Sequence, residues 1–375
     1  MGEFKVSLDD KSFSFADRLS SAQCIAYKEE SEMSFNLMVT SLDVAQKLKM
    51  FSYGSGITDC PLAWDTHGRS IYFSHEGQIH ALNLKTSEVV KLTDFEEDLE
   101  ISWHLQCSAD GERLLFKLGR TLDDHRWEAS LCTIETNGSG FQVVAAGPNI
   151  WQSAANWEQD VLVWSTTRCE IWKSELSGNN SLLLINAKGV AHQLSLSPDG
   201  EMIAFELHDG LYILSTVDSR LKRVVADGKS PSWSPDGKWI AFLKGDCDLW
   251  LLDAETYKFR RLLRVIGGGF SWEWKPRREF WRVRPVWSQD SRFLWFGLTK
   301  VRRTLTIKDT RHNGFPEDDY FRKLSPQEQK KMRKNFREFA HMDFFQRNGV
   351  VDFHENKVWI FNENWHDVAW APKEF

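Results

Sequence analysis

The chain has 375 residues and a formal net charge of −6 at pH 7, and 42% of its residues are hydrophobic. The negative balance gives no electrostatic reason to expect a nucleic-acid partner, and no apolar run reaches the ~18 residues typical of a membrane-spanning helix. The six cysteines show no C-x-x-C spacing and the first residues show no signal-peptide core, which predicts a cytoplasmic protein with reduced thiols.

The first predicted strands form an incomplete set of three: Cys24–Lys28, Asn36–Ser41 and Ala45–Phe51. From there on the chain repeats one frame, in which a short apolar strand ends at an anchor residue, a tight turn follows, and a second apolar strand begins. The anchors are Trp64, Cys107, Trp157, Leu196, Trp233, Trp287 and Trp370. Their usual spacing of about 40–50 residues fits four short strands with their turns, which is one blade of a β-propeller.

Two copies of the frame are nearly identical. Ser195–Gly200 is followed by the strand-like Met202–Phe205, and Ser232–Gly237 is followed by Trp239–Phe242. Each turn contains Pro-Asp-Gly, in which Pro presets φ, Asp caps backbone N–H groups and Gly supplies the positive φ. The phrase therefore predicts a hairpin that begins each blade.

The two ends of the chain complement one another. Trp370 lies five residues from the last residue, whereas the three N-terminal strands lack a first strand. We therefore predict that residues 368–372 pair with the strand at Cys24 and close the ring. This gives an all-β fold, a seven-bladed β-propeller closed by the C-terminal strand, in one domain over residues 1–375. Six blades with a decorated end are the alternative.

The last blade contains one insertion, residues 311–347, that does not read as strands. Ser325-Pro326-Gln327-Glu328 is a capping box with Pro at the first helical position, which predicts a helix over 326–346. Phe336 and Phe339 form an apolar stripe, and lysines and arginines surround it. Such a helix either packs on the propeller with a solvated basic face or serves as a lid or a docking site for a protein partner.

The Ser-Pro-Asp-Gly-x-x-Ile-Ala-Phe phrase resembles the WD40-like (PD40) repeat of TolB-type propellers. Residues 195–205 and 232–242 match it closely, and the other copies match in frame only. The resemblance implies the propeller fold over roughly residues 20–310 and 348–375. It says little about function, because propellers of this kind include binding proteins, enzyme domains and true enzymes.

In a propeller the first strand of every blade lines the central channel, so residues three and four positions before each anchor are expected to meet at one mouth. This reading, with neighbouring residues added, predicts a ligand site. Its members are Trp103, His104, His192, Gln193, Lys229, Arg282, Arg284, Trp365, His366 and Asp367. Arginine binds carboxylate or phosphate in a bidentate manner, and the tryptophans offer faces for a sugar ring.

Three functions remain open at this stage. The first is a binding propeller that takes a small anionic or sugar-like molecule, a glycan or a peptide at the mouth. The second is a metal-dependent enzyme in which His104, His192 and His366 hold a divalent metal. The ring of residues is similar in kind to that of oligogalacturonate lyases, which act on acidic sugars. The third is a protein-interaction scaffold. No serine-hydrolase elbow, P-loop or dinucleotide-binding motif occurs in the sequence.

Overall fold

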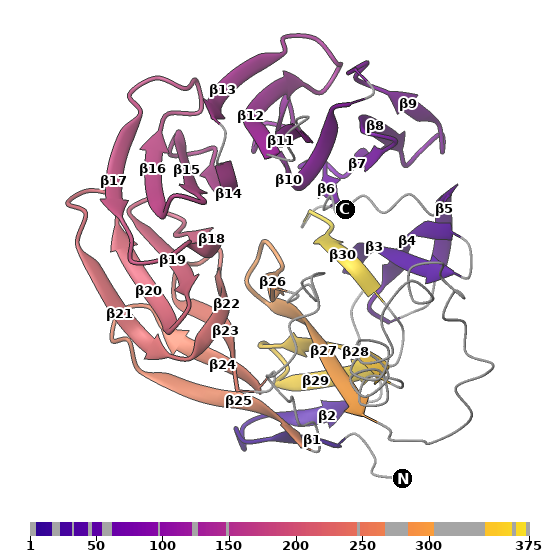
Figure 1. Cartoon of the computed structure of the whole chain (residues 1–375). Helices are drawn as coiled ribbons and strands as arrows, with labels where there is room; N and C mark the ends of the chain where they lie inside the picture. Colours follow the sequence, from indigo (N-terminus) through magenta and orange to yellow (C-terminus); the bar gives the residue numbers. More distant parts are fainter. Residues whose placement is uncertain are drawn as a thin grey trace, which may run out of the picture.

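Seven β-sheets stand around one axis in the computed structural model of the chain (Figure 1). The structure describes residues 5–16, 23–31, 34–43, 47–54, 62–96, 98–121, 127–147, 150–245, 248–266, 284–303, 342–361 and 365–372. These residues contain no helix, and therefore none that could cross a membrane. The all-β, seven-bladed propeller predicted from the repeat is confirmed.

The blades follow one another in chain order. Blade 1 consists of β6 (Ala63–Trp64), β7 (Ser70–His75), β8 (Gln78–Asn83) and β9 (Val89–Lys91). Blade 2 consists of β10 (Glu100–Cys107), β11 (Arg113–Thr121), β12 (Trp127–Glu135) and β13 (Gln142–Gly147). Blade 3 consists of β14 (Ile150–Asn156), β15 (Val161–Thr166), β16 (Glu170–Ser174) and β17 (Leu182–Asn186). Blade 4 consists of β18 (His192–Leu196), β19 (Met202–Leu207), β20 (Gly210–Ser215) and β21 (Leu221–Ala226).

The remaining three blades complete the ring. Blade 5 consists of β22 (Gly228–Trp233), β23 (Trp239–Lys244), β24 (Asp248–Asp253) and β25 (Phe259–Ile266). Blade 6 consists of β26 (Val286–Trp287), β27 (Phe293–Arg303), β28 (Met342–Asp352) and β29 (Lys357–Phe361). Blade 7 joins the two ends of the chain, because β30 (Trp365–Trp370) pairs with β3 (Cys24–Ser31), which continues into β4 (Ser34–Ser41) and β5 (Lys47–Gly54).

The Pro-Asp-Gly turns hold the first two strands of a blade together through a serine. In blade 4 the Ser197 hydroxyl donates to Asp199 at 2.5 Å and accepts from the Met202 N–H at 2.9 Å. In blade 5 the Ser234 hydroxyl makes the same two bonds with Asp236 and Trp239. The repeated phrase is therefore a local structural unit, which explains why it can be recognised in the sequence.

The hydrophobic core lies between neighbouring blades, in seven separate clusters that follow the seams of the ring. At the seam of blades 3 and 4, for example, Val163 packs with the fully buried Ile203 and Phe205. The faces of twisted sheets are apolar, and each face is covered by the next blade.

Anchor tryptophans link three successive seams by hydrogen bonds. The indole N–H of Trp64 donates to the carbonyl of Ala369 in blade 7 at 2.9 Å. Trp370 donates in the same way to Val286 in blade 6 at 2.9 Å, and Trp287 to Ser232 in blade 5 at 3.0 Å. Each bond runs from the end of one inner strand to the inner strand of the preceding blade.

Two short N-terminal strands that the sequence analysis missed cover the rim of the ring. The strand β1 (Lys5–Leu8) pairs antiparallel with β25, and β2 (Ser14–Ala16) pairs parallel with β29. Residues 5–16, here called the strap, thus extend from the outer edge of blade 5 to that of blade 6 (Figure 1).

The helix predicted over 326–346 is wrong at its C-terminal end. Residues 342–347 belong to β28, where Met342 opposes Arg303 and Arg347 opposes Leu298. The capping box indicates where a helix starts, but the ladder with β27 determines the backbone here because it pairs every residue of an 11-residue strand. The rest of the predicted insertion, residues 311–341, lies outside the described residues. The insertion point falls between β27 and β28 of blade 6.

The anchor hydrogen bonds predict a difference between two similar substitutions. Trp287→Phe removes an indole that bonds Ser232, whereas Trp233→Phe removes a buried indole N–H that bonds none of the described residues. We expect the Trp287 variant to lose about 1–2 kcal/mol more of the free energy of unfolding than the Trp233 variant. Urea unfolding of both variants measures this, and equal losses would show that the indole bonds do not stabilise the seams.

Candidate functional site at the mouth of the ring

The inner strands carry an extra residue near their starts. In blade 4 the ladder moves from the pair His192–Glu206 to the pair Ser195–Ala204, so three steps along β18 match two along β19. Blade 5 repeats this between Lys229 and Ser232, and Gln193 and Ser230 have positive φ angles of 54° and 50°. These are β-bulges, which redirect side chains locally. We call this end of the ring, where the inner strands begin, the mouth.

Side chains on the second strands of blades 2, 3 and 4 form hydrogen bonds with the backbone at the start of the following blade. Lys117 on β11 donates to the carbonyl of Trp151 in blade 3 at 2.9 Å. Ser165 on β15 donates to Ala191 in blade 4 at 2.9 Å. Glu206 on β19 accepts from the backbone N–H of Ser230 in blade 5 at 3.2 Å. All three side chains are buried, so they form a polar belt that holds the mouth of each blade against its neighbour.

Arg284, just before β26, reaches across to a blade that is not its neighbour. Its guanidinium donates to the Leu194 carbonyl at 2.9 Å and to the Ser195 hydroxyl at 3.2 Å, both on β18 of blade 4. Burial lowers the pKa of Arg284 to about 10, so it is cationic at neutral pH. Within the part of the chain that the structure describes, no carboxylate forms an ion pair with it. Arg284 therefore brings to the mouth a positive charge that no described carboxylate pairs.

His104 on β10 faces the same charge from blade 2. Burial, with smaller contributions from Lys117 and Arg284, lowers the pKa of His104 to about 4, so the ring is neutral at pH 7. A backbone hydrogen bond at Ser153 favours the protonated form, as a bond from a ring N–H to a carbonyl does. Among the described residues, Nε2 is buried without a hydrogen-bond partner. A neutral imidazole has one N–H donor and one nitrogen acceptor.

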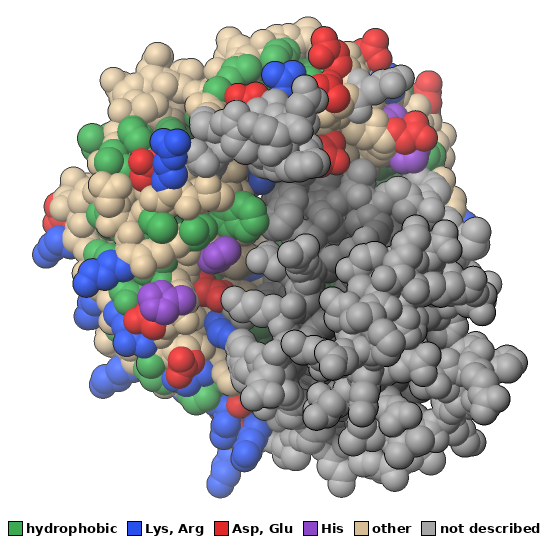
Figure 2. Space-filling view, in the orientation of Figure 1, with side chains coloured by type: hydrophobic (Ala, Val, Ile, Leu, Met, Phe, Trp, Pro, Cys, Tyr) green, Lys and Arg blue, Asp and Glu red, His purple; other side chains and the backbone are tan. Residues whose placement is uncertain are grey.

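A hydrogen bond from blade 3 determines which ring nitrogen of His192 on β18 carries the proton. Its Nδ1 accepts a hydrogen bond from the indole N–H of Trp151 at 3.0 Å, and the two rings meet edge to face with centroids 5.8 Å apart. An imidazole that accepts through Nδ1 carries its proton on Nε2. His192 therefore offers an N–H donor. In the view of Figure 2, histidine side chains are exposed over the region of β18–β21.

The structure brings only part of the predicted ligand set together. His104 and Arg284 interact electrostatically, His192 and Gln193 both contact blade 3, and Lys229 is half-buried at the bulge of blade 5. Arg282 lies outside the described residues, and so do the side chains of Trp103, Trp365, His366 and Asp367. The ligand set as a whole stays a prediction.

Four contributors to the mouth escaped the sequence analysis: Lys117, Trp151, Gln152 and Glu206. Blade 3 was read two residues too late, because Ala155, not Trp157, opposes Leu162 in the way that the anchor Leu196 opposes Ile203 in blade 4. A signal for the other two exists in the sequence. Lys117 and Glu206 each follow three apolar residues in a second strand, and a charge at that position is unusual for a strand buried on both faces.

Comparisons with known proteins give structural matches only. No protein-family model and no curated protein sequence matches the chain. An oligogalacturonate lyase from Vibrio parahaemolyticus superposes with a TM-score of 0.59 at 12% identity, covering 79% of this chain and 93% of that one. An oligogalacturonate lyase in complex with manganese gives 0.57 at 11% identity, covering 80% and 95%. TolB from Acinetobacter baumannii gives 0.46 at 16%, covering 68% and 66%.

The fold is a seven-bladed β-propeller. This agrees with the resemblance found in the repeated phrase, and at such identities the likeness extends to the fold alone.

The manganese in one of these structures raises the question of whether the described residues fit a metal. Among them, no group of three His, Cys, Asp or Glu side chains is placed to hold an ion. His192 cannot ligate through Nε2 while Trp151 donates to its Nδ1, because that bond places the proton on Nε2. His104 lies in the positive field of Lys117 and Arg284. The described donors do not fit a divalent cation, and the side chain of His366 lies outside them.

The low pKa of His104 predicts a pH dependence of stability. The folded state resists protonation of this ring down to about pH 4, whereas the unfolded chain takes up the proton near pH 6.5. Between these values the unfolded state binds more protons, so stability falls as pH decreases, by up to about 3 kcal/mol from this group. We expect His104→Gln to flatten the curve of unfolding free energy between pH 6.5 and 4. A variant whose curve parallels the parent would show that His104 is not held neutral.

Proposed function

We propose that the chain is a ligand-binding propeller that holds a small hydroxylated anion, of the sugar-acid type, at the mouth of the ring. The observation that carries this is Arg284, a half-buried cation whose described contacts are a carbonyl and a hydroxyl. Two of the five guanidinium N–H groups make these contacts, and the other three, which bond no described residue, are the donors that would bind an anion.

The neighbouring groups define what else the ligand would carry. The Nε2–H of His192 is a second donor suited to an anionic oxygen. His104 is neutral at pH 7, and a neutral imidazole exchanges hydrogen bonds with a hydroxyl group more readily than with a second anionic oxygen. A carboxylate with hydroxyl groups on the same small framework satisfies all three. The acidic sugar named for the structurally similar lyases belongs to this chemical class.

The test is calorimetric titration with D-galacturonate, compared with D-galactose, which has the hydroxyl groups but no carboxylate. Galacturonate is expected to bind and galactose to bind at least tenfold more weakly, since a charged hydrogen bond contributes about 1.5–3 kcal/mol. Arg284→Gln is expected to weaken galacturonate binding by about tenfold or more. A matched control is Arg223→Gln, because Arg223 pairs with Asp209 on the outer part of blade 4.

Two results would contradict the proposal. One is equal affinity for galacturonate and galactose, and the other is equal weakening by the Arg284 and Arg223 variants. Melting temperatures of both variants show whether the fold is kept, so that loss of binding is not confused with unfolding.

The alternative of a metal-dependent enzyme makes a separate prediction. Because the described donors do not fit a divalent cation, we expect the melting temperature to stay within about 1 °C when Mn²⁺ is added at 1,000 times the protein concentration. A site would stabilise the fold by about 4 kcal/mol wherever the free Mn²⁺ concentration reached about 1,000 times its dissociation constant. A clear rise that is lost in His366→Ala would restore the three-histidine site.

A further inference from the structure

The strap shows how the outer rim of this ring accepts an added strand. It supplies β1 to the free edge of β25 and β2 to the free edge of β29. Between the two strands, Phe13 is 8% exposed and meets Phe353 edge to face, with ring centroids 5.7 Å apart. Phe13 belongs to the core cluster that joins blades 5 and 6. The chain thus fills one seam of its own rim with an extended segment and an aromatic side chain.

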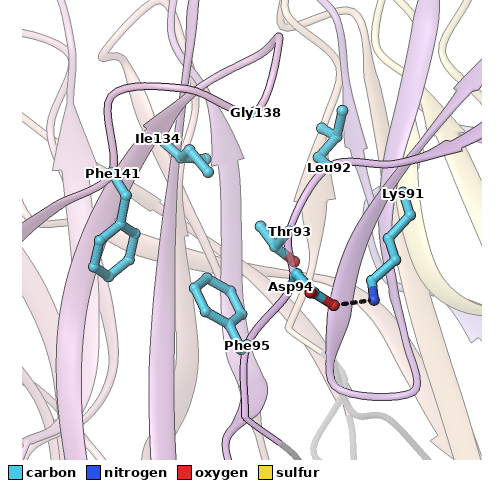
Figure 3. Close-up of a pocket in the computed structure, with 8 residues that line it drawn as sticks. All are labelled: Lys91, Leu92, Thr93, Asp94, Phe95, Ile134, Gly138 and Phe141. Atoms are coloured by element: carbon cyan, nitrogen blue, oxygen red, sulfur yellow. Dashed lines mark hydrogen bonds and ion pairs between the residues drawn. The ribbon is translucent and has the colours of Figure 1, made fainter.

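The corresponding seam between blades 1 and 2 contains an open pocket of about 450 Å³. Leu92 and Phe95, which follow β9 of blade 1, form one wall of the pocket (Figure 3). Gly138 and Phe141, in the turn between β12 and β13 of blade 2, form the other. At the seam filled by Phe13, the walls come from the same two places, β25 and the turn before β29 that holds Phe353. The two seams are equivalent in the fold.

The pocket is held in place without a ligand. Gln78 fixes Phe95 at both ends of its peptide unit, accepting from its N–H at 2.8 Å and donating to its carbonyl at 3.0 Å. The Phe95 ring lies 5.9 Å from the ring of the fully buried Phe116. Gly138 has a φ of +90°, and a Cβ there would lie 2.7 Å from the Leu92 carbonyl oxygen. A preformed pocket of this kind costs little ordering when something binds.

Exposed apolar side chains continue from the pocket onto an open edge. Phe141 is 45% exposed, and Val143 on β13 is 53% exposed. No described strand pairs with the outer edge of β13. An open edge beside an apolar pocket is the arrangement used in strand addition, where backbone bonds give affinity and a side chain gives specificity.

The charges at the pocket favour a neutral side chain in it. Lys91 and Asp94 form an ion pair at 2.6 Å on one side (Figure 3). The other pocket residues are apolar apart from Thr93, whose hydroxyl donates to Gln78 at 2.9 Å. A charged group buried there would lose hydration without gaining an unpaired partner, whereas an aromatic ring would contact Phe95 and Phe141.

We propose that the seam between blades 1 and 2 binds an extended segment of a partner protein. The segment pairs with the outer edge of β13 and places one aromatic side chain against Phe95 and Phe141, as Phe13 does between blades 5 and 6. This site lies on the rim and is independent of the anion site at the mouth.

Photo-crosslinking to the full chain tests the proposal. The probe is a blocked heptapeptide of alternating Thr and Val with a central p-benzoylphenylalanine, and mass spectrometry locates the crosslinks. We expect them within residues 91–95 and 134–143, with competition by the same peptide carrying Phe but not by one carrying Asp. Phe141→Asp is expected to reduce the yield by about tenfold or more, as loss of an aromatic hot spot does.

The matched control is Leu182→Asp, on the outer strand of the next blade, where Leu182 is 56% exposed. It is expected to keep the yield within twofold, and so is Arg284→Gln, which separates this site from the proposed anion site. Phe141→Ser serves as a milder variant if the Asp variant unfolds.

Three results would overturn the proposal. They are crosslinks spread over several outer strands, crosslinks confined to the seam of β25 and β29, and dimers without peptide that Phe141→Asp dissociates. The last would identify the occupant as a second copy of this chain.

Discussion

Each blade of this protein has two apolar faces, and neither can be left in water. The consequence is visible in the core, which is divided among seven seams, each built from two adjacent sheets. At about 25 cal/mol per Å² of apolar surface, an uncovered face costs far more than one hydrogen bond contributes. The ring must therefore close, and the pairing of β30 with β3 is how the two ends of the chain meet that requirement.

The mouth follows from the same constraint. Because the seams occupy the sheet faces, polar side chains lie on the outer strands, as Lys222 and Arg223 do on β21, and around the mouth. The belt of Lys117, Ser165 and Glu206 uses its hydrogen bonds to satisfy bulged backbone in the next blade. Arg284 differs, since it crosses from blade 6 to blade 4, where it bonds a carbonyl and a hydroxyl of β18. Bonds between adjacent blades and a bond between non-adjacent blades thus lie next to each other at one end.

Sequence alone predicted the parts of this fold that short-range interactions determine. The hairpin at Ser197 depends on bonds to residues two and five positions away, so its signature is contiguous and easy to find. The mouth depends on partners about forty or ninety residues distant, such as Trp151 with His192 and Arg284 with Leu194. No local pattern reports those pairings, and one misplaced anchor, Trp157, was enough to shift the reading of blade 3 by two residues. The strap was missed because its strands have only four and three residues and gain their stability from edges supplied elsewhere.

The bulges separate two kinds of register within one strand. On the C-terminal side of the bulge, the Ser195 hydroxyl of β18 accepts hydrogen bonds from the backbone N–H of Trp233 and from the guanidinium of Arg284. Before it, the pair His192–Glu206 follows a different offset. An insertion or deletion of one residue on the N-terminal side of the bulge changes the size of the bulge. The pairing of the C-terminal half of the strand, which packs in the seam, keeps its register. The protein can therefore exchange the chemistry at its axis, blade by blade, while the packed interior stays the same.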